Sequence, residues 1–108
     1  MEPKKLVRFQ MKVREKVAID KSGNQEWYRH GKHHRDGDKP AIIWAIGGRE
    51  WRQHGKCHRD DDKPAVISCH GTQLWYQHGN CHRDGDKPAY IRSDGTRVWF
   101  RDGRPYTP

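Results

Sequence analysis

The chain has 108 residues, of which 31% are hydrophobic, and 22 basic against 14 acidic residues give it a formal net charge of +8 at pH 7. This length is enough for one small domain, and the low apolar content excludes a thick two-layer core. Such a composition is otherwise typical of disorder, but five tryptophans and regularly spaced glycines favour a thin folded sheet. The charge is compatible with nucleic acid, an anionic membrane surface or an acidic protein as partner, and it selects none of them.

The start of the chain alternates between apolar and polar side chains. The apolar residues of this segment are Val7, Phe9, Met11 and Val13, and basic or amide residues separate them. A period of two is the pattern of a strand with one apolar face. We therefore predict that residues 1–15 form an N-terminal capping strand, which covers the first edge of a sheet and whose charges discourage further pairing.

Residues 16–103 are dominated by a unit that repeats every 24 residues, beginning with a degenerate copy near Lys16. Each copy has a tryptophan with a glycine four residues later, and three copies continue into a nearly constant block, His-Arg-Asp-x-Asp-Lys-Pro-Ala, at 34–41, 58–65 and 82–89. Glycines at fixed offsets predict turns, and the β-branched and aromatic runs at 41–46, 65–69 and 89–93 predict strands. Because a fixed period indicates units covered only by their neighbours, the predicted fold is all-β. It is a single-layer, twisted antiparallel meander of stacked 24-residue β-hairpin repeats.

Two details complete the predicted organisation. Asp61 stands where the other copies have Gly37 and Gly85, which predicts that this turn needs no residue with a positive φ. Residues 104–108 are predicted to be a C-terminal tail, whose two prolines block the addition of a further strand. We expect the whole chain, 1–108, to be one domain.

The aromatic, glycine and histidine positions carry a family resemblance. Tyr28 and Tyr76 are each followed after three residues by glycine and after three more by histidine, and Arg52 begins the same spacing. This pattern resembles the MORN repeat. The His-Arg-Asp and Pro-Ala elements are more similar to MORN-variant repeats of phage, giant-virus and bacterial proteins. The resemblance covers residues 16–103 and departs from MORN where arginine follows the histidine. It implies stacked hairpins and, since MORN proteins are mostly scaffolds and some contact lipids, a binding role without a defined partner.

The most regular residues are predicted to form structural ladders along the stack. Tryptophans would supply the hydrophobic spine, histidines would hydrogen bond within turns, and arginines would pair with an aspartate of the same or the next repeat. Aspartates of the block are also expected to cap turn backbone. The predicted ladder consists of Trp27, Trp51, Trp75, Trp99, His34, His58, His82, Arg35, Arg59, Arg83, Asp36, Asp60 and Asp84.

A second row of aromatic residues, on the other side of the sheet from the tryptophans, is a candidate binding platform. Aromatic rings with arginine nearby suit single-stranded nucleic acid or an acidic protein groove. The alternative is that both faces of so thin a protein are structural. The candidate binding residues are Tyr28, Arg29, Arg52, Tyr76, Arg92, Arg97, Phe100 and Arg101.

Metal binding and catalysis are both weakly indicated. Zinc favours His and Cys at short spacing, but neighbours such as Cys57 and His58 point to opposite sides of a strand, and equivalent positions stack into rows without converging. Equivalent cysteines in stacked hairpins lie roughly 10 Å apart, too far for a disulfide, so all three thiols are predicted to be free. Identical acids and histidines on an open sheet do not make one concave catalytic site. No cofactor, metal or catalytic residue is therefore predicted.

These observations predict a non-enzymatic binding module. The resemblance favours a small phage-type accessory protein that docks on a larger host macromolecule, and one version is an inhibitor of a bacterial immune effector such as a CRISPR complex. The expected partner is a protein or ribonucleoprotein. Direct nucleic-acid binding and a zinc-stabilised scaffold are the alternatives, and a dimer through an open sheet edge is a further possibility. Since the sequence contains no membrane-spanning apolar run and no signal peptide core, we expect a cytoplasmic protein without membrane insertion.

Overall fold

The computed structural model describes residues 15–108, so the predicted capping strand, apart from Glu15, lies outside the described residues. The described chain forms strands and turns only. In chain order the strands are β1 (Glu15–Ile19), β2 (Gln25–Arg29), β3 (Lys32–His33), β4 (Ile42–Ile43), β5 (Arg49–Glu50), β6 (Arg52–Gln53), β7 (Lys56–Cys57), β8 (Val66–Ile67), β9 (Gln73–Leu74), β10 (Tyr76–Gln77), β11 (Asn80–Cys81), β12 (Tyr90–Ile91), β13 (Arg97–Arg101) and β14 (Arg104–Tyr106).

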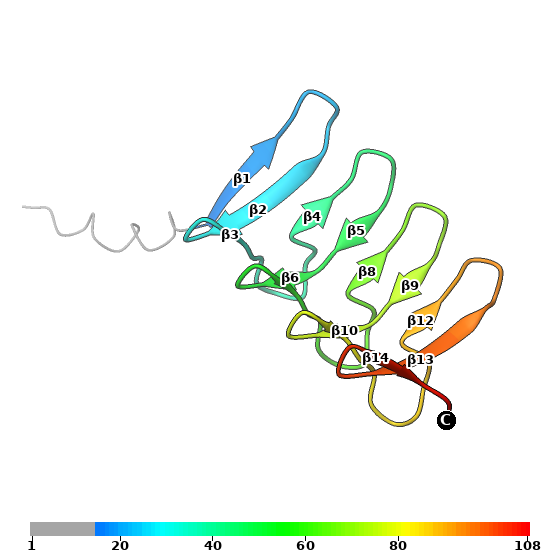
Figure 1. The fold of residues 1–108 in the computed structure, drawn as a ribbon. Helices are drawn as coiled ribbons and strands as arrows, with labels where there is room; N and C mark the ends of the chain where they lie inside the picture. Colours follow the sequence, from blue (N-terminus) through cyan, green and yellow to red (C-terminus); the bar gives the residue numbers. More distant parts are fainter. Residues whose placement is uncertain (1–14) are drawn as a thin grey trace, which may run out of the picture.

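The strands form one long antiparallel meander, which confirms the predicted fold class. Its order is β1-β2-β4-β5-β8-β9-β12-β13-β14, so every neighbour in the sheet follows the previous one in the chain, with short hairpins in between. Hairpins stand side by side along the stack and the sheet does not close into a barrel (Figure 1). The described structure measures 63 × 30 × 18 Å, an elongated body whose short dimension is that of one sheet with its connecting loops.

Each repeat contributes two hairpins instead of one. In the second repeat, β4 and β5 form the main hairpin, and β6 and β7 form a small hairpin at its foot. The predicted strand at 41–46 is wrong in length, because the main turn already begins at Trp44. The Trp44 N–H donates to the Gly48 carbonyl and the Gly47 N–H donates to the Trp44 carbonyl, both at 2.8 Å. Strand β4 therefore has only two residues.

The small hairpins turn through a histidine and a glycine that both have positive φ. His54 and Gly55 have φ values of 52° and 85°, and the other copies follow them closely. Two consecutive residues with positive φ define the type I′ turn, which matches the twist of a tight hairpin. The turns also join neighbouring repeats, since the Gly55 N–H donates to the carbonyl of His33 at 2.8 Å.

The loop after each histidine has the same backbone in all three copies. Gly37 and Asp38 have φ values of 80° and 56°, and Asp61 and Asp62 have values of 65° and 56°. The prediction that Asp61 removes the need for a positive φ is therefore wrong. The contacts that the loop makes with the next repeat require the same backbone, and a short carboxylate side chain tolerates the left-handed region better than most.

At the C-terminal end of the stack the predicted tail is a strand. Residues Arg104–Tyr106 form β14, which pairs with β13 in a hairpin. The Tyr106 hydroxyl donates to Asp86 Oδ1 at 3.0 Å, and the Arg101 guanidinium donates to the same oxygen at 3.0 Å while it stacks on the Tyr106 ring. These two side chains occupy the carboxylate that, in earlier repeats, receives the arginine of the following repeat.

Candidate binding surface

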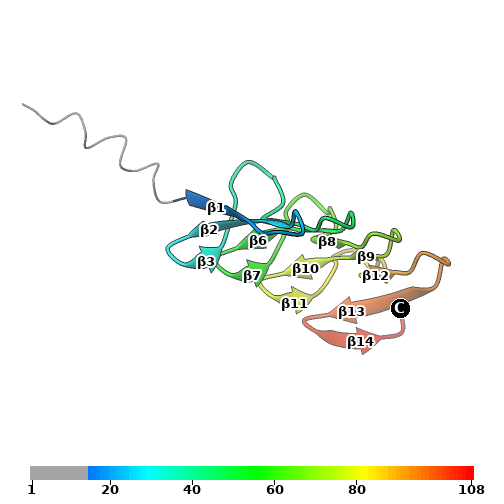
Figure 2. The same cartoon turned by 90° about the horizontal axis from the view of Figure 1, so that it is seen from above.

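One side of the sheet is largely occupied by the tryptophan ladder. Trp51 and Trp75 are buried, at 6% exposure each, while Trp27 and Trp99 at the two ends are half-buried. The Trp51 indole N–H donates to the Asp38 carbonyl at 3.1 Å, and Trp75 and Trp99 make the equivalent bond. Each of these three tryptophans thus lies between its own strand and the loop of the preceding repeat. We call this side the loop face. Figure 2 shows the connecting loops arching to one side, away from the small hairpins.

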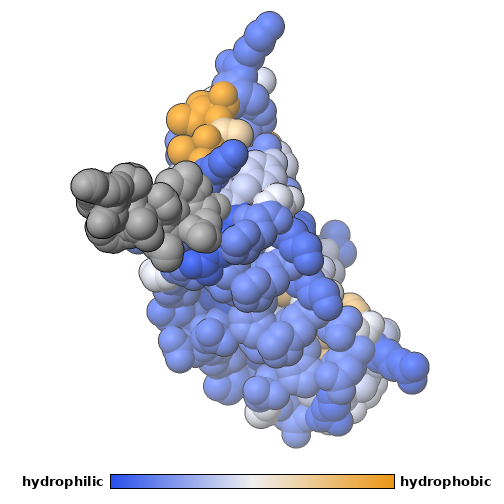
Figure 3. All heavy atoms as spheres, turned by 90° about the vertical axis from the view of Figure 1, so that its left-hand side faces the viewer, coloured by the Kyte–Doolittle hydropathy of each residue, from blue (hydrophilic) through white to orange (hydrophobic). Residues whose placement is uncertain are grey.

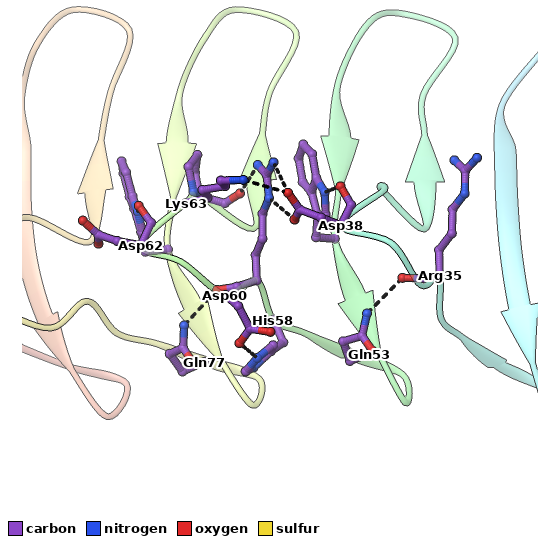
Figure 4. Close-up of polar contacts among 12 residues, drawn as sticks. Arg35, Asp38, Gln53, His58, Asp60, Asp62, Lys63 and Gln77 are labelled. Atoms are coloured by element: carbon purple, nitrogen blue, oxygen red, sulfur yellow. Dashed lines mark hydrogen bonds and ion pairs between the residues drawn. The ribbon is translucent and has the colours of Figure 1, made fainter.

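Arginines of the repeated block clamp neighbouring loops together. The Arg59 guanidinium stacks on Trp51 at 3.7 Å and donates to both carboxylate oxygens of Asp38, at 2.9 and 3.4 Å. Lys63 adds a third bond to Asp38 at 2.9 Å, which can be followed in Figure 4. Arg83 repeats these contacts with Asp62. The predicted direction is therefore wrong, since the acid belongs to the preceding repeat. Arg35 stacks on Trp27 at 3.6 Å and donates to the Pro40 carbonyl.

The aspartates predicted for the ladder pair with the histidines and not with Arg35, Arg59 and Arg83, although Asp36 also lies 3.3 Å from the Arg29 guanidinium. His34 Nε2 lies 2.8 Å from Asp36 Oδ1, and its Nδ1 accepts the backbone N–H of His54 in the next repeat at 3.0 Å. The tautomer that satisfies both contacts carries its proton on Nε2, and this bond is the main cause that holds the pKa of Asp36 below its ordinary value. His58 with Asp60 and His82 with Asp84 repeat the arrangement.

The ion pairs of Asp38 and Asp62 predict that the stability of the protein depends on pH in the acid range. Hydrogen bonds from Arg59, and then from Lys63, lower the pKa of Asp38 from 3.8 to about 2, and the Arg83 bond does most to bring Asp62 to about 2. Because folding depresses both pKa values, their stabilisation is present above pH 4 and is lost as the pH falls from about 4 to about 2. We expect the difference in Tm between the parent and an Asp38→Asn, Asp62→Asn variant to shrink across this window, measured by circular dichroism. A difference independent of pH would contradict the clamp.

The other side of the sheet, which we call the open face, lacks such loops. The register places one row of side chains on it, and this row contains Ala18, Glu26, Ile42, Glu50, Val66, Leu74, Tyr90 and Val98. A second row two residues further along the strands contains Tyr28, Arg52, Tyr76 and Phe100. Contacts between the rows confirm that they share a face, since Tyr28 donates to Glu26 and Arg52 to Glu50.

The structure brings only half of the predicted binding residues together. Tyr28, Arg52, Tyr76 and Phe100 occupy one row of the open face and are all half-buried. The other four predicted arginines are elsewhere. Arg29 and Arg101 pair with the loop carboxylates of Asp36 and Asp86, Arg97 points to the loop face, and Arg92 lies at the tip of a main hairpin. The predicted mixture of aromatic rings and free arginines on one surface is therefore wrong.

The open face changes from polar to apolar along the stack. In the first two repeats Glu26 accepts hydrogen bonds from Tyr28 and His33, and Glu50 accepts two from Arg52. In the third and fourth repeats the same positions carry Leu74 with Tyr76 and Val98 with Phe100, and Tyr90 lies between them. These five side chains are half-exposed. We call them the apolar half of the open face.

Sequence reasoning missed several residues of this face, most clearly Leu74, Tyr90 and Trp44. Trp44 donates from its indole nitrogen to Glu50 Oε2 at 3.2 Å, which places it on the open face. The neighbouring copies have Asp20, Ser68 and Arg92 at the same position. Departure from the repeat was the available signal, because residues shared by all copies build the stack and residues that differ distinguish its surface.

The cysteines and histidines offer little chemistry in the described part. Burial raises the pKa of the Cys57 thiol and raises that of Cys81 to about 11, so both remain protonated at neutral pH. All three cysteines are free. Between Glu15 and Pro108, no three His, Cys, Asp or Glu side chains converge as they would around a metal ion. The same residues contain no helix suited to crossing a membrane.

Comparison with known proteins adds no relative. No protein-family model matches the chain, and no curated protein or solved structure matches it either. Any functional conclusion therefore depends on the surfaces described above.

Proposed function

We propose that this protein is a non-enzymatic module that docks on another protein through the apolar half of the open face. The observation that carries the proposal is the exposure of Leu74, Tyr76, Tyr90, Val98 and Phe100 side by side on a continuous sheet. Aromatic residues with few rotatable bonds dominate binding energy at the centres of protein interfaces. A rigid sheet presents them in a fixed arrangement, which lowers the entropy lost on binding.

The charges on this face favour a protein partner over nucleic acid. Its charged residues in the two rows are Lys16, Glu26, Glu50 and Arg52. Arg52 is engaged by Glu50 at 2.9 Å, and Lys16 lies opposite Tyr28 in the polar half, away from the apolar half. Phosphate groups need unpaired basic side chains, whose counterion release supplies most of the affinity for nucleic acid. An aromatic platform for single strands also needs such a basic track. The open face has the aromatic rings but lacks a row of unpaired basic side chains beside them. Nucleic-acid binding is therefore the alternative outcome of the test.

The resemblance to MORN-variant repeats supplies a more specific version of the proposal. In it, the protein is a phage-type accessory protein and its partner is a host complex, such as a bacterial immune effector. The version has the same physical requirement, an apolar surface on the partner that accepts Tyr76 and Phe100. It predicts in addition that the partner is found in a bacterial lysate.

A matched pair of variants tests the docking surface. We expect a Tyr76→Ala, Phe100→Ala protein to lose its captured partner in a pull-down from bacterial lysate, with affinity reduced by about 30-fold or more, because truncating an interface anchor costs about 2 kcal/mol or more. Tyr28→Ala is the control, since Tyr28 lies in the same row but in the polar half. Circular dichroism would verify that each variant is folded.

The pull-down is done with and without nuclease at moderate salt. Capture that survives nuclease and is lost only in the Tyr76, Phe100 variant supports docking on a protein. Capture that the variant retains, or a partner that disappears on nuclease treatment, would overturn the proposal, and the second result would favour direct nucleic-acid binding.

A further inference from the structure

We infer that the part of the loop face nearer the tips of the main hairpins is a second docking surface. It fits a protein surface carrying apolar and acidic side chains. The register lines up one residue from each main strand in a row that we call the isoleucine row. Its members are Ile19, Gln25, Ile43, Arg49, Ile67, Gln73, Ile91 and Arg97. The row lies beside the tryptophan ladder, two residues closer to the hairpin tips.

The apolar part of the row is available to a partner. Every repeat places an isoleucine in it, and Ile19 is 66% exposed while Ile43, Ile67 and Ile91 are half-exposed. The ladder uses the tryptophans two residues away, and these isoleucines are not fully buried by it. A β-branched side chain held on a sheet loses little further freedom on binding, so the row is suited to an interface.

The basic side chains of the row are Arg49 and Arg97. Arg49 and Arg97 are exposed, and within residues 15–108 neither guanidinium makes a hydrogen bond or an ion pair with another side chain. Other arginines of the stack, such as Arg59 and Arg83, are held by carboxylates. Arg49 and Arg97 are four strand spacings apart, roughly 19 Å.

An apolar side chain is also exposed at one hairpin tip. Ile46 is 79% exposed at this tip, where the other tips carry polar residues.

The sign of the charge selects the partner. The isoleucine row holds two arginines and no carboxylate, so it suits a partner that carries acidic side chains. The carboxylates of the open face, Glu26 and Glu50, already accept hydrogen bonds from His33 and Arg52. A second copy docked through the same row would bring arginines together, and nucleic acid would leave the isoleucines without an apolar contact. An acidic and apolar protein surface satisfies both kinds of side chain, and binding on both faces would make the protein a bridge.

Photo-crosslinking from the row tests the inference independently of the open face. Gln73 lies between Ile67 and Ile91 in the register, so a benzoylphenylalanine at position 73 would react with a protein docked there. The probe is this labelled full-length protein in bacterial lysate, with the same label at Leu74 on the open face for comparison. We expect an adduct from position 73 whose yield falls at least about tenfold with Arg49→Glu, Arg97→Glu. It should persist with Arg49→Lys, Arg97→Lys and with the control Arg92→Glu.

The remaining outcomes separate this inference from the proposed function. An adduct at position 73 that survives Tyr76→Ala, Phe100→Ala but not the arginine reversal supports two surfaces. No adduct at position 73, an adduct that the arginine reversal leaves intact, or one that is removed by nuclease or consists of two copies of this chain would overturn the inference. Each of these results leaves the test of the open face unaffected.

Discussion

Replacing Trp51 with alanine is expected to unfold the protein at ambient temperature, or to lower its stability by about 3–5 kcal/mol, the usual cost of removing a large buried ring. Trp51 is 6% exposed in the middle of the stack. Its loss removes the hydrogen bond to the Asp38 carbonyl and the surface on which Arg59 stacks. A domain of this size has only about 5–15 kcal/mol to lose, and cutting a linear array at its centre uncouples both halves. Urea denaturation followed by tryptophan fluorescence and circular dichroism measures the change.

Two further substitutions make the Trp51 result interpretable. Trp51→Phe keeps an apolar ring but removes the indole N–H, so it should cost less than alanine. Trp99→Ala removes an equivalent ring at the exposed end of the stack, where fewer repeats depend on it, and it should be the mildest of the three. If Trp51→Ala melted like the parent and lost binding instead, the tryptophan ladder would be the binding surface and its role as the spine would be wrong.

The residues that recur in every copy are the ones from which the fold could be predicted. The 24-residue period with its glycines and tryptophans predicts turns, strands and a meander, and the structure contains all three. Glycine offsets are informative because a positive φ is a local requirement of the chain. The lengths of the strands were less predictable, since the Trp44 to Gly48 turn shortens β4 through backbone hydrogen bonds that β-branched composition does not reveal.

Contacts between repeats were harder to predict than the repeats themselves. The sequence indicates that Arg59 needs a carboxylate, but its own block offers three aspartates and the two neighbouring blocks offer four more. The choice of Asp38 depends on where the preceding loop crosses Trp51, which is a property of the assembled stack. For the same reason Asp61 adopts a positive φ that its side chain alone would not predict.

The candidate surfaces could be predicted only in part, because they follow differences between copies. Tyr28, Tyr76 and Phe100 were recognisable as an aromatic row. The replacement of Glu26 and Glu50 by Leu74 and Val98 has no effect on the repeat pattern, yet it changes one half of the open face from polar to apolar. Which arginines share a face depends on register, and a one-residue offset separates Arg97 from Val98.

Replacing a histidine that connects two repeats is expected to have the second large effect on stability. His34→Ala is expected to lower stability by about 1–3 kcal/mol, the cost of leaving a buried polar group without its partner. The side chain is 2% exposed, its Nδ1 accepts the His54 N–H, and its Nε2 donates to Asp36. His34→Asn should recover part of the loss, because the asparagine Oδ1 can occupy the position of Nδ1 and accept the same N–H. Thermal and urea unfolding of the three proteins would measure these differences.

His82→Ala is the matched comparison for His34→Ala. It shows whether the loss of stability comes from burial of the hydrogen bonds or from loss of the imidazole ring. His82 makes the same two contacts, with the Asp102 N–H and with Asp84, and it also joins an outer pair of repeats. Its side chain is 18% exposed against 2% for His34, so water can satisfy the freed groups and the alanine substitution should cost less. Both substitutions remove the contact with an aspartate and the acceptor of a backbone N–H, and His34→Ala also removes a 3.1 Å contact with Arg29 Nη1. The greater burial of His34 and this additional contact should both make its loss the larger one. An equal or larger loss for His82→Ala would mean that desolvation does not set the strength of these links, and that the ring contributes through its packing alone.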